Sequence, residues 1–150
     1  MKAVIQRVSN AVVSVNDKTI GQIGHGLLIL LGIEDKDNTG DVLWLAKKII
    51  GMRIFSDENG KMNLNLSSTG GELLVISQFT LHASTKKGTR PSYIKAARPE
   101  KSIPLYEEFI SECEALTSKP VQSGEFGSNM KVELLNDGPV TIIIDSQNRE

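Results

Sequence analysis

The run Leu27-Leu28-Ile29-Leu30-Leu31 is apolar at every position and follows the break Gly24-His25-Gly26. A strand with one face in water alternates polar and apolar residues, whereas a continuous apolar run indicates a strand buried on both faces. This run therefore predicts a central strand that is covered from two sides. The rest of the chain is expected to supply the neighbouring strands and the layers that cover them.

The segments on either side of this run predict the other strands. Two β-rich segments open the chain with Ser9-Asn10 as a bend between them, and a turn at Asn16-Asp17-Lys18 leads into a third. A second strongly apolar strand comes later, and two strands close the chain. The expected strands cover residues 3–8, 11–15, 19–23, 27–31, 72–81, 131–135 and 140–144, with 121–126 as a weaker candidate.

Two amphipathic helices are expected between the strands. The first is capped by Thr39 and ended by Gly51, with one apolar stripe along its length. The second covers roughly residues 100–117 and has Cys113 among its apolar residues, so we interpret this thiol as part of the core rather than as a nucleophile. We therefore expect an α/β fold, a mixed-sheet, barrel-like single domain over residues 1–150 with two main helices.

The composition limits the classes of function. A chain of 150 residues can bury a core without structural metal, and its single cysteine excludes an internal disulfide. Polar Gln6 and Arg7 come too early for a signal peptide, and no apolar run approaches membrane-spanning length. We expect a soluble, cytoplasmic protein with no membrane partner. Because the formal net charge is only -1, nucleic-acid binding would need a local basic patch.

Conventional catalytic signals are missing. The sequence has no nucleophile elbow, phosphate-binding glycine loop, dinucleotide fingerprint or zinc-protease helix. Its two histidines, His25 and His82, lack a metal-ligand partner at helical or turn spacing. Glu34-Asp35-Lys36-Asp37 includes a lysine and does not match the calcium-loop pattern, so we interpret it as a solvated turn. We expect no metal and no cofactor.

The strand ending Ser77-Gln78-Phe79-Thr80-Leu81 is open to two interpretations. It is either an ordinary strand end with polar residues in solvent, or the border of a ligand crevice where an amide and backbone N–H groups hold a carbonyl oxygen. On a strand, Thr80 and His82 share a face and could form a hydroxyl nucleophile with its base. Nothing in the sequence supplies the third group that would orient such a pair.

Asn136-Asp137-Gly138-Pro139-Val140-Thr141 places a Gly-Pro step at the start of an apolar run. One interpretation is a turn between two strands. The other is a bend made for a purpose, because proline cannot donate to a sheet and Gly138 removes the side chain that would crowd the bend. Such a bend presents two bare backbone carbonyls, especially if the Gly-Pro bond is cis.

The connection between residues 82 and 99 is electropositive. Between residues 82 and 101 the only acidic residue is Glu100. The cations in the same stretch are Lys86, Lys87, Arg90, Lys95, Arg98 and Lys101. A solvated lysine-rich loop is one interpretation, and a surface that contacts phosphates is the other. Gly88 and Pro91 shape the loop, and Tyr93 could stack on a base.

Three of these segments together resemble the motifs of the D-aminoacyl-tRNA deacylases, also called D-tyrosyl-tRNA deacylases. They are Ser77-Gln78-Phe79-Thr80-Leu81, the basic segment Lys86-Lys87-Gly88-Thr89-Arg90-Pro91-Ser92, and Asn136-Asp137-Gly138-Pro139-Val140-Thr141. Val4-Ile5-Gln6-Arg7-Val8 and the segments 124–127 and 130–132 are similar to the family as well. Each motif alone is weak, but their order and spacing are specific and cover essentially the whole chain.

The resemblance implies hydrolysis of the ester that joins a D-amino acid to the 3′-terminal adenosine of tRNA. It also implies a homodimer with active sites at the subunit interface. In this family a cis Gly-Pro pair enters the partner's site, and its carbonyls exclude an L side chain while a D side chain points outward. Selectivity is then mainly rejection, so glycine mischarged onto tRNA escapes the filter and is also released.

Residue by residue, the resemblance makes Gly138 and Pro139 the chiral filter and Arg7 the residue that holds its orientation. Ser77 belongs to the same substrate-binding set. Departures from the family pattern are mild: Ser128-Asn129 stands where Ala-Asp is common, and Tyr93 stands where Phe is common.

The catalytic set implied by the resemblance is Gln78, Phe79 and Thr80. Gln78 and the Phe79 backbone N–H would bind the ester carbonyl. Thr80 has been regarded as a nucleophile, although the prevailing view gives the chemistry to the 2′-hydroxyl of the terminal ribose, which positions or activates water. The cations Lys86, Lys87 and Arg90 would face the phosphates of the acceptor stem.

Two other functions stay open at this point. One is a non-catalytic RNA-binding module that uses the basic segment, which would bind without turnover. The other is an esterase for small molecules that depends on Thr80 and tolerates a change at Gly138.

Overall fold

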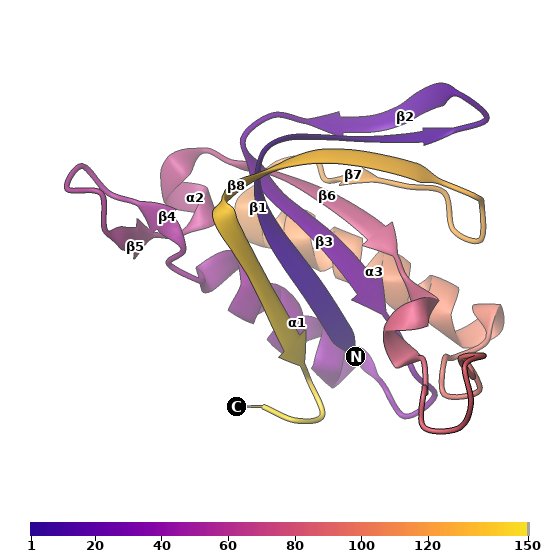
Figure 1. Cartoon of the computed structure of the whole chain (residues 1–150). Helices are drawn as coiled ribbons and strands as arrows, with labels where there is room; N and C mark the ends of the chain where they lie inside the picture. The colour runs from indigo at the N-terminus through magenta and orange to yellow at the C-terminus, as the bar shows by residue number, and fades with distance from the viewer. Residues whose placement is uncertain (150) are drawn as a thin grey trace.

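A long first strand organises the sheet, in a computed structural model that describes residues 1–149 (Figure 1). β1 (Lys2–Val15) pairs antiparallel with β2 (Lys18–Ile23), with β3 (Gly26–Gly32) and with β8 (Lys131–Asp145). On the far side of β3 lie two parallel neighbours, β6 (Glu72–Ser77) and β7 (Gln122–Ser123). The strand order is β2-β1-β3-β6-β7, with β8 paired to β1 off this path. The predicted mixed, barrel-like sheet is confirmed.

The apolar run of residues 27–31 forms β3 and is covered on both faces, as predicted. Leu27, Ile29 and Leu31 point into a core shared with the helices. Leu28 points the other way, into a second core that includes Val13 of β1. The second core lies inside the curl of the sheet, which explains why β3 has no polar face.

The two strand pairs predicted at the chain ends are each one continuous strand. β1 runs through Ser9-Asn10 with a register shift against β8, so the expected bend is a bulge and not a break. In β8, Asn136 pairs with Val8 and Thr141 pairs with Gln6. Residues 137–140 therefore stand opposite Arg7 alone, and the Gly138-Pro139 step lies in a wide bulge inside the strand.

Two main helices cover one face of the sheet and pack against each other (Figure 1). They are α1 (Thr39–Gly51) and α3 (Pro99–Thr117), at the places that the sequence predicted. The cap of α1 is Asn38 and not Thr39, because the Asn38 side chain accepts from the Gly40 N–H at 2.8 Å. The Asp41 carboxylate completes a capping box by accepting from the Asn38 N–H at 3.1 Å.

Three smaller elements complete the chain. β4 (Phe55–Ser56) and β5 (Met62–Leu64) form a separate antiparallel hairpin. A short helix, α2 (Leu66–Thr69), follows, and the Asn65 side chain caps it. Within residues 1–149, no helix is both long and apolar enough to cross a membrane.

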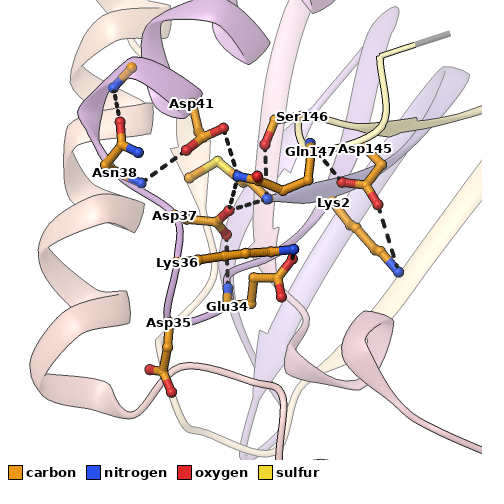
Figure 2. Close-up of polar contacts among 12 residues, drawn as sticks. Lys2, Glu34, Asp35, Lys36, Asp37, Asn38, Asp41, Asp145, Ser146 and Gln147 are labelled. Carbon is orange, nitrogen blue, oxygen red and sulfur yellow. Dashed lines mark hydrogen bonds and ion pairs between the residues drawn. The ribbon is translucent and has the colours of Figure 1, made fainter.

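The first residue of the chain is tied into a buried polar cluster (Figure 2). The Met1 amino group forms an ion pair with the Asp37 carboxylate and donates to Ser146 Oγ at 2.9 Å. All three residues are buried. Gln147 joins the cluster by donating from Nε2 to carboxylate oxygens of Asp37 and Asp41, at 3.2 and 3.0 Å. The interpretation of residues 34–37 as a solvated turn is therefore wrong for Asp37.

Cys113 lies fully buried on α3, as the core interpretation predicted. Burial first, and the nearby Glu112 and Glu114 carboxylates second, raise the pKa of its thiol from 9.0 to about 12. The folded chain thus holds this proton more tightly than the unfolded chain. The resulting stabilisation is complete below pH 9 and is lost as the pH rises from about 9 to about 12.

We predict a corresponding difference between the native protein and Cys113→Ala. Between pH 9 and 10 the free energy of unfolding should fall more steeply in the native protein, by up to about 1.4 kcal/mol per pH unit. The other buried group of this kind, Tyr106, has its pKa raised by burial from 10.0 to about 12 and so contributes mainly above pH 10. Urea denaturation at half-unit intervals of pH measures the two slopes, and equal slopes would contradict the prediction.

Candidate active site

The candidate site begins where β6 ends. β6 stops at Ser77, and the chain then turns into a 3-10 helix, η1 (Phe79–His82), instead of continuing as a strand to Leu81. Gln78 makes the transition: its N–H still donates to the Leu31 carbonyl of β3 at 2.7 Å, while its own carbonyl accepts from Leu81 N–H at 3.2 Å. The predicted alternation of side chains beyond Ser77 is therefore wrong.

A cavity of about 440 Å³ opens beside this turn. It lies between the ends of β3 and β6, the start of α3 and the segment that precedes β8. Ser77, Gln78 and Phe79, which the sequence predicted as site residues, are part of its wall. The remaining lining residues are Leu31, Ile33, Ile76, Ala96, Ala97, Pro99, Ser102, Phe126, Gly127, Ser128, Met130 and Val132.

The cavity wall carries hydrogen-bond donors. Phe79 is the first residue of η1, where backbone N–H groups lack an acceptor inside the helix, and it donates to no acceptor among residues 1–149. Gln78 donates from Nε2 to Thr80 Oγ1 at 2.5 Å, which fixes the direction of its amide. A backbone N–H and an oriented side-chain amide are the groups that bind a carbonyl oxygen on which negative charge develops.

The pair of Thr80 and His82 does not form a nucleophile with its base. The two residues lie on a 3-10 turn and do not share a strand face. His82 is buried, and its Nε2 has no hydrogen-bond partner among residues 1–149. The hydrogen bond that Thr80 Oγ1 accepts comes from Gln78 instead.

Arg7 holds the bulge of β8 that contains Gly138 and Pro139. Its side chain is buried, and its Nε donates to the Asp137 carbonyl at 2.9 Å while Nη1 donates to the Ile54 carbonyl at 2.6 Å. The peptide bond between Gly138 and Pro139 is cis, and both residues are exposed. The structure thus places Arg7 of β1 directly beside the bulge of β8 that contains Gly138 and Pro139.

This loop and the cavity lie at opposite ends of β3. Val8, beside the loop, pairs with Gly26 at the start of β3, whereas Gln78 is bonded to Leu31 near its end. Five residues of strand separate these positions, which corresponds to roughly 17 Å. Gly138 and Pro139 are not among the residues that line the cavity. Within one protomer, therefore, the predicted filter and the predicted catalytic residues do not form one site.

The basic segment forms a closed loop next to η1. Ser84 and Ser92 pin its base by exchanging two backbone hydrogen bonds of 2.8 and 2.9 Å. Lys86, Lys87 and Arg90, the predicted tRNA-binding residues, are exposed between these two serines. None of the three forms an ion pair with any residue in the described range 1–149.

Several lining residues were missed by sequence reasoning. Phe126, Ser128 and Met130 come from the weakly patterned segment before β8, and Ala97 and Ser102 come from the start of α3. For Phe126 and Met130 the only sequence signal was that segments 124–127 and 130–132 resembled a known family. For metals, no three histidine, cysteine or acidic side chains in the described part of the chain lie close enough to hold an ion.

Comparisons with known proteins identify the family of the chain. The family model for D-Tyr-tRNA(Tyr) deacylase matches residues 4–145. Two proteins named D-aminoacyl-tRNA deacylase, from Parabacteroides distasonis and Flavobacterium psychrophilum, are each 59% identical over 150 residues, which covers 100% of both chains.

Two solved structures are also similar. A protein described as c-Myc DNA Unwinding Element Binding Protein superimposes with a TM-score of 0.90 at 36% identity, covering 97% of this chain and 98% of its own. A probable eukaryotic D-amino acid tRNA deacylase has a TM-score of 0.81 at 16% identity, with 95% and 97% coverage, and supports the fold alone. The chain therefore belongs to the D-aminoacyl-tRNA deacylase family, and it is a hydrolase.

Proposed function

We propose that this protein hydrolyses the ester of D-aminoacyl-tRNA and releases free D-amino acid and tRNA. The observation that carries the proposal is the cavity at the end of β6, which is lined by Phe79, whose backbone N–H has no acceptor among residues 1–149, and by Gln78, whose amide is oriented by Thr80. Both donors are uncharged. They therefore suit the carbonyl oxygen of an ester better than a carboxylate or phosphate, which would need a cationic partner. Family membership supports the substrate class.

The chemistry needs little from the side chains. A water oxygen forms a bond to the ester carbon, the bond from that carbon to the 3′ oxygen breaks, and the proton ends on the 3′ oxygen of the tRNA. Gln78 and the Phe79 N–H stabilise the charge on the carbonyl oxygen. The 2′-hydroxyl of the terminal ribose positions or activates the water, which agrees with the absence of a nucleophile–base pair at Thr80 and His82.

Chirality is read by a second copy of the chain. Gly138 and Pro139 of one protomer reach the cavity of its partner, where their carbonyls leave no space for an L side chain. Gly138 and Pro139 do not line the protomer's own cavity, and they lie toward the opposite end of β3 from it, which supports this arrangement. Glycine has no side chain to reject, so glycine mischarged onto tRNA(Ala) is hydrolysed as well.

The surface of β8 supports a homodimer. Among residues 1–149, β8 pairs only with β1, apart from a bridge between its last residue Asp145 and Asn148. Its other edge is thus unpaired over most of 15 residues, a length that proteins usually cover. Leu135 and Ile143 on this strand are 57% and 73% exposed. A second copy would bury them.

The basic segment supplies the contact with nucleic acid. Lys86, Lys87 and Arg90 face the phosphates of the acceptor stem, because exposed cations without acidic partners release counterions when phosphates replace them. We place the protein in the cytoplasm, with translation and its aminoacylated substrates, as an enzyme of chiral proofreading.

The test is the release of tyrosine from matched D-tyrosyl-tRNA and L-tyrosyl-tRNA by the purified protein in the presence of a metal chelator. We expect rapid loss of the D ester and no acceleration for the L ester. Binding of tRNA without hydrolysis of either ester would instead support an RNA-binding module. Hydrolysis of both esters at similar rates would overturn the chiral filter.

We predict that Thr80→Val keeps substantial activity. Valine removes the acceptor for Gln78 Nε2 and so costs about 1 kcal/mol of positioning, less than about tenfold in kcat/KM. A nucleophile would be indispensable, and its loss would cost on the order of 10⁴-fold or more. Single-turnover hydrolysis of D-tyrosyl-tRNA measures the effect, with Thr80→Ser as the control that retains a hydroxyl. Complete loss in Thr80→Val alone would favour the Thr80-dependent esterase.

A further inference from the structure

An exposed pair of aromatic rings stands at the edge of the cavity. The rings of Phe79 and Tyr93 contact each other edge to face, with centroids 5.2 Å apart and planes at 75°. Phe79 lines the cavity, but 57% of it is exposed, and 40% of Tyr93 is exposed. Large apolar side chains that remain in water beside a binding cavity indicate a contact surface for a ligand.

The backbone holds this pair in place. Phe79 begins η1, which the Leu81 N–H and the Ala83 N–H close by bonding to Gln78 and Thr80 carbonyls. Tyr93 directly follows Ser92, whose two hydrogen bonds with Ser84 pin the basic loop, and its carbonyl accepts from Ala96 N–H at 3.0 Å. The backbone positions that carry the two rings are therefore held beside the cavity, and the contact between the rings reduces the ordering needed when a ligand binds.

The charge around the pair is of one sign. From residue 73 to residue 99 the chain has no aspartate or glutamate, and its cations are Lys86, Lys87, Arg90, Lys95 and Arg98. An apolar peptide would gain nothing from these cations. Aromatic faces combined with unpaired cations instead fit single-stranded nucleic acid, in which bases stack while the backbone phosphates lie along the positive charge.

We propose that Phe79 and Tyr93 form a stacking platform for the unpaired nucleotide that precedes the terminal adenosine of the substrate tRNA. This inference rests on the proposed function, because it takes the terminal adenosine and its ester to occupy the adjoining cavity. The cations of the pinned loop hold the phosphates of the same unpaired strand. Tyr93 is in this scheme a positioning residue, which orients the strand and does not touch the reacting atoms.

The experiment compares two D-tyrosyl esters. One is D-tyrosyl-tRNA, and the other is D-tyrosyl-adenosine, which has the terminal nucleoside but nothing before it. Stacking of one base contributes enough that Tyr93→Ala should lower kcat/KM on D-tyrosyl-tRNA by about tenfold, mainly through KM. The same variant should hydrolyse D-tyrosyl-adenosine at the rate of the native protein. Tyr93→Phe retains the ring and should match the native protein on both esters.

Other outcomes overturn the platform. Equal losses on the two esters would make Tyr93 a support for the cavity wall, and no loss on either would remove it from recognition. If the native protein hydrolyses neither ester, the proposed function fails. The platform is then judged by binding of uncharged tRNA with and without its unpaired 3′ nucleotides. Tyr93→Ala must weaken binding of the first only, and equal binding of native protein and Tyr93→Ala overturns it.

Discussion

Gly138→Ala is expected to lower hydrolysis of D-tyrosyl-tRNA on the order of 100-fold, because a displacement of about 1 Å in a positioned group has effects of this size. Gly138 has a φ of 138°, a conformation that residues with a side chain rarely adopt. A Cβ there would lie 2.9 Å from Arg7 Nη2 and 2.8 Å from Val140 Cγ2. The methyl group must therefore displace the loop that Arg7 holds. Single-turnover release of tyrosine measures the change.

Gly60→Ala is the matched control for this substitution. Gly60 also has a positive φ, 75°, but a Cβ at that position meets no atom within 4 Å. Gly60→Ala also introduces a side chain at a positive φ, but it lacks the collision with Arg7. Gly60→Ala should retain activity and lose only about 1 kcal/mol of stability. Activity of Gly138→Ala within threefold of the native protein would place Gly138 outside the site.

Asp37→Asn is expected to destabilise the fold by about 3 kcal/mol, because it leaves the Met1 ammonium group buried without its counter-charge. Asp37 also accepts from the Glu34 N–H at 2.8 Å, so the turn before α1 loses part of its support. For a chain of this size, the midpoint of thermal unfolding should fall by roughly 6–12 °C. The measurement is urea and thermal denaturation at one fixed protein concentration, with a carboxyl-terminal tag so that the Met1 amino group is left free.

Asp35→Asn controls for the removal of a negative charge from the same turn. Asp35 is exposed, and its carboxylate points away from the cluster around Met1 (Figure 2). This variant should change the free energy of unfolding by less than about 0.5 kcal/mol. Equal stability of Asp37→Asn and Asp35→Asn would contradict the prediction, because the ion pair between Asp37 and Met1 would then contribute no more than an exposed charge.

Local patterns were sufficient to predict most of the sheet and helices. The continuous apolar run of β3 was enough to predict that the strand is buried on both faces, although its neighbouring strands were not known. The spacing of apolar residues in α1 and α3 similarly reports the one face that each helix buries. Such signals depend only on the side chains of the element itself, which is why they were reliable.

The errors came where distant contacts decide the structure. Gln78 keeps its bond to β3 while the chain leaves the sheet, so residues 79–81 look like a strand in composition and form a turn in space. Asp37 is buried because its partner is the Met1 amino group, 36 positions earlier in the sequence. Neither contact leaves a trace in the residues on either side.

The candidate site divides in the same way. The motif at residues 77–79 and the Gly138-Pro139 step were singled out from their residue types; the first lines the cavity, and the second is an exposed bulge outside it. That they lie at opposite ends of β3 follows from strand register, which no local pattern contains. The lining residues Phe126 and Met130 come from an irregular segment whose position is set only by its packing.

The pairing of β1 with β8 also determines when the sheet can be completed as the chain is synthesised. Lys2 pairs with Asp145, so the partner of the first strand is made 143 positions later. At roughly 5–20 residues per second, β1 waits on the order of ten seconds with the backbone N–H and C=O groups of one edge unpaired. β8, which pairs with that edge, also contains Gly138 and Pro139. A chain released early by a stalled ribosome therefore lacks both the strand that completes the sheet and the proposed filter.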